Sequence, residues 1–150
     1  MTYTNDDFAV LKNGIDSRMN IIRHNDTEFY NITKGIEMLS RTNEYTPRLT
    51  LSQLFDEEDI KQMIAACKES TKLETVLFEV KSGTDQQFMG VYVHHALYDY
   101  FLWFLSTDYA VKMCKVADDC FQKIQEEERL INQMADQLNA KIKQLEMANQ

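Results

Sequence analysis

The sequence is poor in the residues that break regular structure. Four glycines and one proline are spread over 150 residues, so the chain favours helices and has no glycine-rich loop that could hold a phosphate group. Hydrophobic residues make up 44% of the chain and aromatic residues 11%, which excludes a disordered protein. The length fits one domain with an appendage.

Motifs for catalysis and metal binding are also missing. The sequence has no H-E-x-x-H, no zinc-type Cys/His quartet, no G-x-S-x-G and no P-loop. Cys67, Cys114 and Cys120 have no C-x-x-C spacing, and we predict reduced thiols buried on helices. His94 and His95 fall in a predicted strand, where neighbouring side chains point to opposite faces and could not share one ion. The sequence therefore predicts no enzyme, no metal and no cofactor.

Signals for secretion or membrane insertion are absent as well. The first ten residues, MTYTNDDFAV, lack the basic and apolar parts of a signal peptide. The apolar run Ala96–Leu105 has about half of the roughly 20 residues that a membrane span needs. We expect an intracellular protein that is not secreted and has no membrane partner.

Charge is unevenly distributed along the chain. The formal net charge of −8 argues against a protein that coats nucleic acid without specificity. Ser17–Leu54, however, contains five cations and four acids. The acidity is densest at Asp56–Asp59, which we interpret as a helix start, where the helix dipole favours acids by ~0.3–1 kcal/mol per group.

The first half of the chain predicts a hairpin followed by a short helix. Residues 1–17 are weakly patterned and fit either a short helix or a docking segment. Met19–His24 and Glu28–Ile32 read as paired strands joined by a tight turn. Thr33 is then the expected N-cap of the short helix.

The middle of the chain predicts a helix, a second hairpin and a core helix. Asp56–Ser70 has the helical apolar stripe, with Asp56 as its expected N-cap. Thr75–Lys81 and Phe88–His94 form the expected hairpin. Ala96–Leu105 is apolar on nearly all sides, so we assign its aromatic residues to the core rather than to base stacking. They are Tyr98, Tyr100, Phe101, Trp103 and Phe104.

The C-terminal part predicts one long helix from Tyr109 to Gln150. Ser106 is its expected cap, and Tyr109–Ile124 is amphipathic and should pack on the domain. Further on, apolar residues recur every seven positions, although Glu127 and Lys141 interrupt the alternate positions, which is typical of an imperfect coiled coil. The expected dimerisation residues are Ile124, Ile131, Met134, Leu138, Ile142 and Leu145.

Two alternatives stay open for that helix: it folds back on its own domain, or it frays. With the coiled coil as the first choice, the expected domains are residues 1–124 and residues 125–150.

Cations near the predicted hairpins and helices suggest a nucleic-acid surface. A helix and a hairpin that both carry cations commonly enter a groove of DNA and contact phosphates, although ordinary solubilising residues would look the same. The candidates on the pattern are Arg23, Lys34, Arg41, Arg48, Lys61, Lys68, Lys72 and Lys81.

Three stretches resemble a known family. Phe29–Lys34 (FYNITK) is similar to an aromatic/Val-Asn-Ala-Thr-Lys segment, and Leu51–Glu69 resembles the helical region that follows it. Gly90–Met113 is similar to Gly-x-Trp-Val-His-Pro-x-Leu followed by Trp-x-Ser-Pro-x-Phe-Ala-x-x-Val. In this order, over Met19 to Ile124, they resemble the KilA-N domain and its relative Bro-N, found in phages and large DNA viruses. The departures are His95 for Pro, Tyr92 for Trp, Thr107 for Pro, Leu54 for Trp, and the acids 56–58 where basic residues are common.

The resemblance implies an α+β domain of small β-hairpins packed with helices, related to the fungal APSES DNA-binding fold. It implies a viral DNA-binding protein with a regulatory or replication-associated role, working in the cytoplasm or nucleus of an infected cell. It also marks Asn31, Thr33 and Lys34 as DNA-contact positions, although Asn31 and Thr33 suit an Asx turn and a helix cap equally well. The acidic stretch keeps an alternative open, a protein-interaction or assembly module with the same fold and little affinity for DNA.

Overall fold

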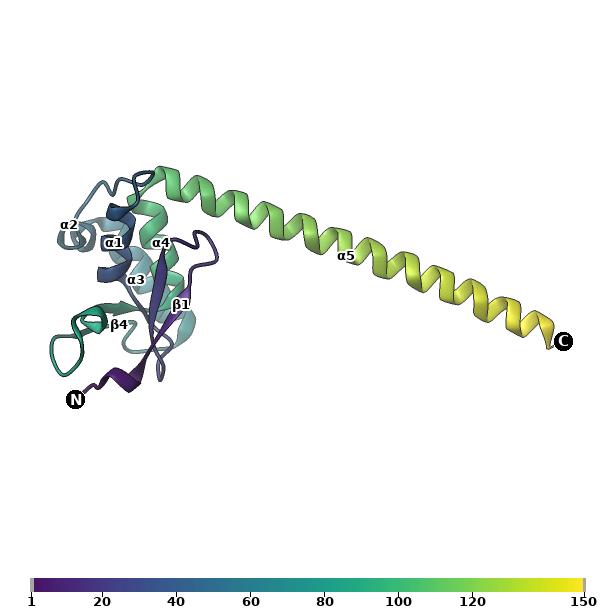
Figure 1. Ribbon diagram of the computed structural model, residues 1–150, viewed down its shortest axis with the longest axis horizontal. Helices are drawn as coiled ribbons and strands as arrows, with labels where there is room; N and C mark the ends of the chain where they lie inside the picture. Colours follow the sequence, from purple (N-terminus) through teal and green to yellow (C-terminus); the bar gives the residue numbers. More distant parts are fainter. Residues whose placement is uncertain (1, 150) are drawn as a thin grey trace. The chain divides into compact units, whose positions relative to one another are not determined.

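The computed structural model describes residues 2–149, which fall into two compact units. The first unit, Met1–Met113, is an α+β domain, and the second, Cys114–Gln150, consists of the larger part of one long helix (Figure 1). The predicted fold class is thereby confirmed, whereas the pairing of the long helix with another helix stays a prediction.

The first unit contains one antiparallel sheet with the strand order β1-β2-β3-β5-β4. The strands are β1 (Phe8–Lys12), β2 (Asn20–His24), β3 (Tyr30–Asn31), β4 (Leu77–Val80) and β5 (Gly90–Val93). Both predicted hairpins are present, and they join because β3 pairs with β5. The prediction for residues 1–17 was wrong, since a 3-10 turn, η1 (Asn5–Asp7), leads into β1, which pairs with β2 along its whole length.

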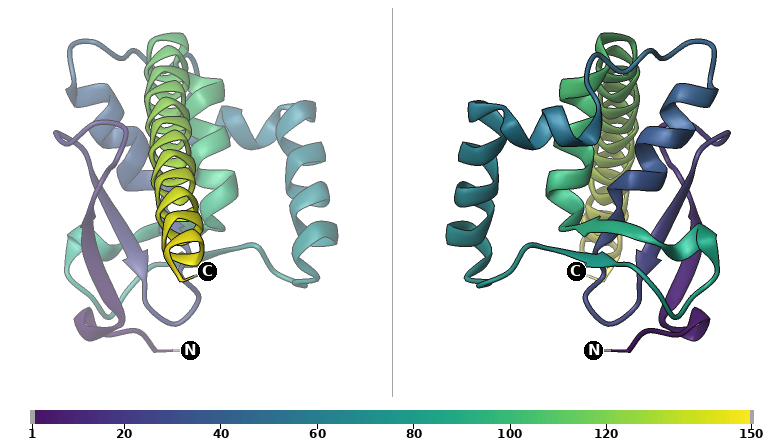
Figure 2. Two further views of the ribbon diagram at one scale, coloured as in Figure 1. Left: turned by 90° about the vertical axis from the view of Figure 1, so that its right-hand side faces the viewer. Right: turned by 90° about the vertical axis from the view of Figure 1, so that its left-hand side faces the viewer.

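Helices pack against the sheet and against one another. They are α1 (Ile32–Arg41), α2 (Leu51–Asp56), α3 (Glu58–Thr71), α4 (His95–Leu105) and α5 (Thr107–Ala148), and a 3-10 turn, η2 (Gln86–Phe88), lies between β4 and β5. Helix α4 lies between α1 on one side and α2 and α3 on the other (Figure 2). No helix within residues 2–149 is long and apolar enough to span a bilayer.

Two predicted helix starts were wrong by a few residues. Helix α1 begins at Ile32 because Asn31, and not Thr33, is the N-cap, which shortens the expected second strand to two residues. Asp56 is the last residue of α2, and the N-cap of α3 is Glu57, which makes no side-chain capping bond. Glu58 and Asp59 do lie in the first turn of α3, where their charge complements the helix dipole.

Helix α4 forms the centre of the core, as its composition predicted. Its inward side chains are Leu97, Tyr98, Phe101, Leu102 and Leu105, all fully buried. Helix α1 approaches α4 closely because Gly35 has no side chain. A Cβ at that position would lie 2.8 Å from the Tyr98 ring. The core assignment of Trp103 was wrong, since Trp103 is 46% exposed and stacks on Tyr100.

A buried carboxylate fixes the loop between β1 and β2. Asp16 is 3% exposed and accepts hydrogen bonds from the Arg18 guanidinium at 2.6 Å, the Tyr45 hydroxyl at 2.7 Å and the Lys112 ammonium at 3.1 Å. These donors, Arg18 above all, hold the pKa of Asp16 well below its usual range. The carboxylate therefore connects three segments that are distant in sequence.

Helix α5 begins at Thr107, two residues before the predicted start, and its apolar side chains become exposed sooner than expected. The Ser106 hydroxyl accepts from the Tyr109 amide, which confirms the cap. The first compact unit ends at Met113, however, and Phe121 and Ile124 are exposed, so the packing expected up to Ile124 was wrong. The prediction of buried thiols holds for Cys67 and fails for the exposed Cys114 and Cys120.

Candidate nucleic-acid interface

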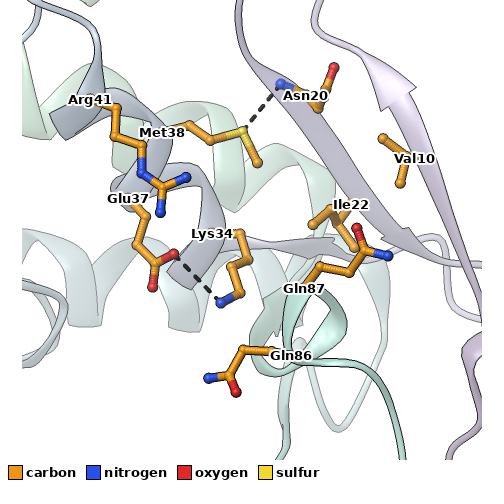
Figure 3. A pocket seen from close by; sticks show the side chains of 9 residues that line it. All are labelled: Val10, Asn20, Ile22, Lys34, Glu37, Met38, Arg41, Gln86 and Gln87. Carbon is orange, nitrogen blue, oxygen red and sulfur yellow. Dashed lines mark hydrogen bonds and ion pairs between the residues drawn. The ribbon is translucent and has the colours of Figure 1, made fainter.

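A groove lies between α1 and the β1–β2 hairpin, next to η2, and we call it the α1 groove (Figure 3). Its volume is about 370 Å³. The lining residues come from three separate segments of the chain. They are Val10, Asn20, Ile22, Lys34, Glu37, Met38, Arg41, Gln86 and Gln87.

One wall of the groove is a stripe along α1. Lys34, Glu37, Met38 and Arg41 have the i, i+3, i+4, i+7 spacing that places side chains on one helix face. The Lys34 ammonium lies 3.5 Å from the Glu37 carboxylate, and Arg41 is exposed in the last turn. The stripe therefore carries two cations and one anion, with the Lys34 side chain 15% exposed beside Glu37 and Arg41 more open to a ligand.

The position of α1 on the sheet is set by the motif that suggested the family. The Asn31 side chain accepts from the Lys34 amide and donates to the Met89 carbonyl, both at 2.9 Å, and is 1% exposed. The Thr33 hydroxyl accepts from the Val91 amide at 2.9 Å. Because the Asn31 amide group and the Thr33 hydroxyl are used within the protein, we leave both residues out of the proposed contact surface.

Glycine is required where this motif meets β5. Gly90 has φ +130°, a backbone conformation that residues with a side chain rarely adopt. A Cβ there would lie 2.7 Å from the Thr33 Cβ and 2.9 Å from the Asn31 side-chain oxygen. Asn31, Thr33 and Gly90 therefore position Lys34 and the rest of the α1 stripe.

Neutral amides line the groove opposite α1. Asn20 comes from the start of β2, and Gln86 and Gln87 come from η2. All three are exposed, and Asn and Gln are the side chains that make paired hydrogen bonds with adenine in the major groove. Sequence reasoning missed them because uncharged amides in a strand end and a turn carry no periodic or electrostatic signal.

A second hollow of about 700 Å³ adjoins the α1 groove and shares Asn20, Met38 and Arg41 with it. Arg18 also lines this hollow. Its guanidinium is paired with Asp16 and with Glu44, so its charge is partly neutralised. The α1 groove and this second hollow together are lined by three cations, Lys34, Arg41 and Arg18.

Three further predicted cations do not line the α1 groove, and each has a partner close by, so their contact with DNA stays a prediction. The Arg23 guanidinium donates to the Asn25 side chain at 3.3 Å. Arg48 donates to the Phe104 carbonyl and lies 5.2 Å from the Phe104 ring, which fixes the loop before α2 on α4. Lys81, 77% exposed after β4, lies 3.9 Å from the Glu79 carboxylate.

The lysines of α3 form a separate surface. Lys61 and Lys68 are exposed on α3, and Lys72 is its left-handed C-cap. Helix α3 lies across α4 from α1 (Figure 2). The structure therefore brings Lys34 and Arg41 together and leaves Lys61, Lys68 and Lys72 on another side of the domain.

The histidine pair is arranged differently from the prediction. His94 is the N-cap of α4, and its ring accepts from the Ala96 amide at 3.2 Å. The His94 and His95 rings lie 4.1 Å apart, so the argument from opposite strand faces was wrong. Within residues 2–149, no group of three or more His, Cys, Asp or Glu side chains is placed to hold a metal ion.

A family model, the KilA-N domain, matches residues 15–123. The chain belongs to the KilA-N domain family. The match covers β2 to β5 and α1 to α4, and it confirms the family that the three sequence stretches suggested. KilA-N domains are in general DNA-binding modules, so DNA is the expected ligand class for this KilA-N chain. No curated protein and no solved structure matches the chain.

Proposed function

We propose that this KilA-N protein binds duplex DNA through the α1 groove. The observation that carries the proposal is the convergence in one groove of two cations, Lys34 and Arg41, with three amides from β2 and η2. The cations suit phosphate oxygens, which position a protein on the duplex. The amides suit base edges, above all adenine.

Binding is expected to be moderate and sensitive to salt. Glu37 lies in the same groove and opposes phosphate, and the chain as a whole carries a net charge of −8. Two or three phosphate contacts would give a slope of log K against log salt of about −2 to −3.

The wider role that we propose is regulatory or replication-associated, without enzymatic activity, in an infected cell. Its support is the resemblance to domains of phages and large DNA viruses. Self-association through the exposed apolar residues of α5, from Ile124 to Leu145, belongs to the same proposal, because a helix of this kind is expected to have a partner.

A second candidate is a non-enzymatic interaction or assembly module with the same fold. The acids at 56–59 and the stacked Tyr100 and Trp103 on α4 favour it, since exposed aromatic residues are enriched at protein interfaces. This candidate predicts a protein partner and little affinity for DNA.

Fluorescence anisotropy with a labelled duplex, measured over a salt series, tests the proposal. The groove variant Lys34→Gln/Arg41→Gln should weaken binding about tenfold or more and lower the salt slope by about 2. The variant Lys61→Gln/Lys68→Gln removes the same charge from α3 and should leave binding nearly unchanged.

Two results would contradict this account in different ways. A wild-type chain that does not bind at low salt, or binds without a salt slope, would overturn the DNA-binding function in favour of the second candidate. An equal loss in both double variants would leave DNA binding intact and overturn the assignment to the α1 groove.

A further inference from the structure

The part of α5 beyond Met113 exposes a continuous apolar stripe. Its large side chains are between 44% and 66% exposed, although residues of these types are usually buried. Such a stripe on an isolated helix indicates a partner surface. The stripe consists of Phe121, Ile124, Ile131, Leu138, Ile142 and Leu145.

The exposed residues favour a register that differs from the simplest heptad. If the alternate positions were Cys120, Glu127, Met134 and Lys141, two opposite charges would lie inside the seam. In the other register, one set of core positions is Ile124, Ile131, Leu138 and Leu145. The second set is Phe121, Glu128, Ala135 and Ile142, and the two sets alternate at spacings of 3 and 4, as a coiled coil requires. This second register buries one charge and moves Glu127 and Lys141 to the flanks, where charges commonly lie.

The surface of α5 has a hollow in the middle of this second seam. It is lined by Met134, Ala135, Gln137, Leu138 and Lys141. The small side chain of Ala135 leaves space between its larger neighbours. In a coiled coil, such a hole receives one side chain of the facing helix.

Charge decides the direction in which a second copy fits this seam. In a parallel pair with equal register, Glu128 would face Glu128 of the other copy inside the seam, which is unfavourable. In an antiparallel pair centred on Gln133, Glu128 faces Leu138 of the second copy instead. The same register places Ile131 at Ala135, and Phe121 at Leu145, of the second copy.

The flanking charges agree with the antiparallel direction. Around Gln133, Glu127 of each helix lies beside Lys141 of the other, which gives two attractive pairs by symmetry. Asp118 and Glu146 approach each other only near the ends of the seam, where both are exposed and solvent screens their repulsion. A parallel pair would gain Lys141 beside Glu146 but would keep the two Glu128 side chains face to face.

We propose that α5 pairs antiparallel with a second copy of this chain, with Ile131 of each helix inserted at Ala135 of the other. The proposal rests on the self-association included in the proposed function. It adds the partner, the register and the direction of the seam.

Disulfide trapping in the full chain tests the direction. The background is Cys114→Ser/Cys120→Ser, and the two probes are Phe121→Cys and Leu145→Cys. A disulfide needs Cα atoms about 4.4–6.8 Å apart. In the antiparallel pair, the two copies of residue 121 are about 36 Å apart at about 1.5 Å per residue, so neither probe alone should crosslink. The two probes refolded together under reduction and then oxidised should give a mixed covalent dimer.

The possible outcomes separate the two proposals. A chain that sediments as a monomer at every concentration overturns the self-association itself. A dimer whose single probes crosslink to themselves overturns only the antiparallel direction, and a dimer without any crosslink overturns the register.

A charge exchange gives an independent test in the same full chain. Glu127→Lys should weaken the dimer about tenfold, because two attractive pairs become repulsive. Adding Lys141→Glu should restore the wild-type Kd in the antiparallel pair. In a parallel pair the added change would instead face Glu146 and weaken the dimer further, which would contradict the proposal.

Discussion

Apolar residues of similar types are buried in the first unit of the chain and exposed in the second. In the first unit, Phe101 and Leu102 are fully buried on α4, whereas Ile131 and Leu138 on α5 are exposed. In the first unit, the sheet and the helices α1 to α4 cover one another's apolar faces. The second has one helix and no covering surface within Cys114–Asn149. The difference is consistent with a domain that folds through its own contacts, and the exposed apolar face of α5 is what motivates the proposed pairing with a second chain.

The largest expected effect lies in the first unit, at the junction of α1 and β5. Gly90→Ala combines an unfavourable φ with an overlap on Thr33 and Asn31, and should lower the free energy of unfolding by about 4 kcal/mol. Trp103, the only tryptophan, reports unfolding in urea by its fluorescence. Gly14→Ala is the control, since nothing lies within 4 Å of that position. Equal midpoints for the two variants would show that the junction is not under the constraint described.

The second effect should be confined to α5. Ile131→Asp places a charge in the seam of each helix and should weaken the dimer by about 3 kcal/mol, roughly a hundredfold in Kd. Sedimentation velocity measures the Kd, and the Trp103 unfolding curve of the monomer should not move. Gln133→Asp adds the same charge on the outer face of α5 and should leave the dimer unchanged. A shifted Trp103 curve would show that the two units are not energetically separate.

The third effect concerns the buried carboxylate of the first unit. Asp16→Asn should reduce the free energy of unfolding by about 2 kcal/mol at neutral pH, because charge-assisted hydrogen bonds are lost. Since the pKa of Asp16 is lowered in the folded protein, this stabilisation is complete above the unfolded value of about 3.9 and is lost as the pH falls below it. Urea unfolding of both proteins from pH 7 to pH 3 should show the difference shrinking only below about pH 4. Glu69→Gln is the control for charge, and a difference that is independent of pH would contradict the prediction.

The smallest effect lies in the α1 groove. Glu37→Gln removes the anion 3.5 Å from Lys34 and should tighten DNA binding about threefold, since exposed pairs and single charges contribute up to about 1 kcal/mol. Anisotropy at low salt measures the change, with Glu69→Gln on α3 as the control. Weaker binding by Glu37→Gln would mean that phosphate does not approach this wall.

Much of the fold could be predicted because local patterns and tertiary contacts agree. Ile21 and Ile22 in β2, and Val91 and Val93 in β5, are β-branched residues that favour strands. Strand β1 was missed because its state depends on pairing with β2, which the weak pattern of residues 1–17 does not encode.

The cap of α1 shows a second limit. Asn31 and Thr33 can both cap a helix, and their roles are assigned by the Met89 carbonyl and the Val91 amide. These partners are distant from Asn31 and Thr33 in the sequence, so the roles of the two residues can be told apart only in the folded sheet.

The candidate site was predictable only in part. Lys34 and Arg41 carry a charge signal, and the family motif ends at Lys34. Gln86 and Gln87 are uncharged and have no such signal in the sequence. They line the groove because the β4–β5 hairpin places η2 beside α1. The lysines of α3 are as recognisable in the sequence as Lys34 and Arg41. They do not lie at the α1 groove, however, because α4 separates α3 from α1.

DNA is proposed to bind the first unit at the α1 groove. The most direct measurement is the NMR spectrum of the side-chain amides during titration of the full chain with an adenine-containing duplex. If DNA binds in this groove, the signals of Asn20, Gln86 and Gln87 should shift, while that of Gln62, exposed on α3, should not. Binding that shifts Gln62 and leaves the three groove amides unchanged would contradict it.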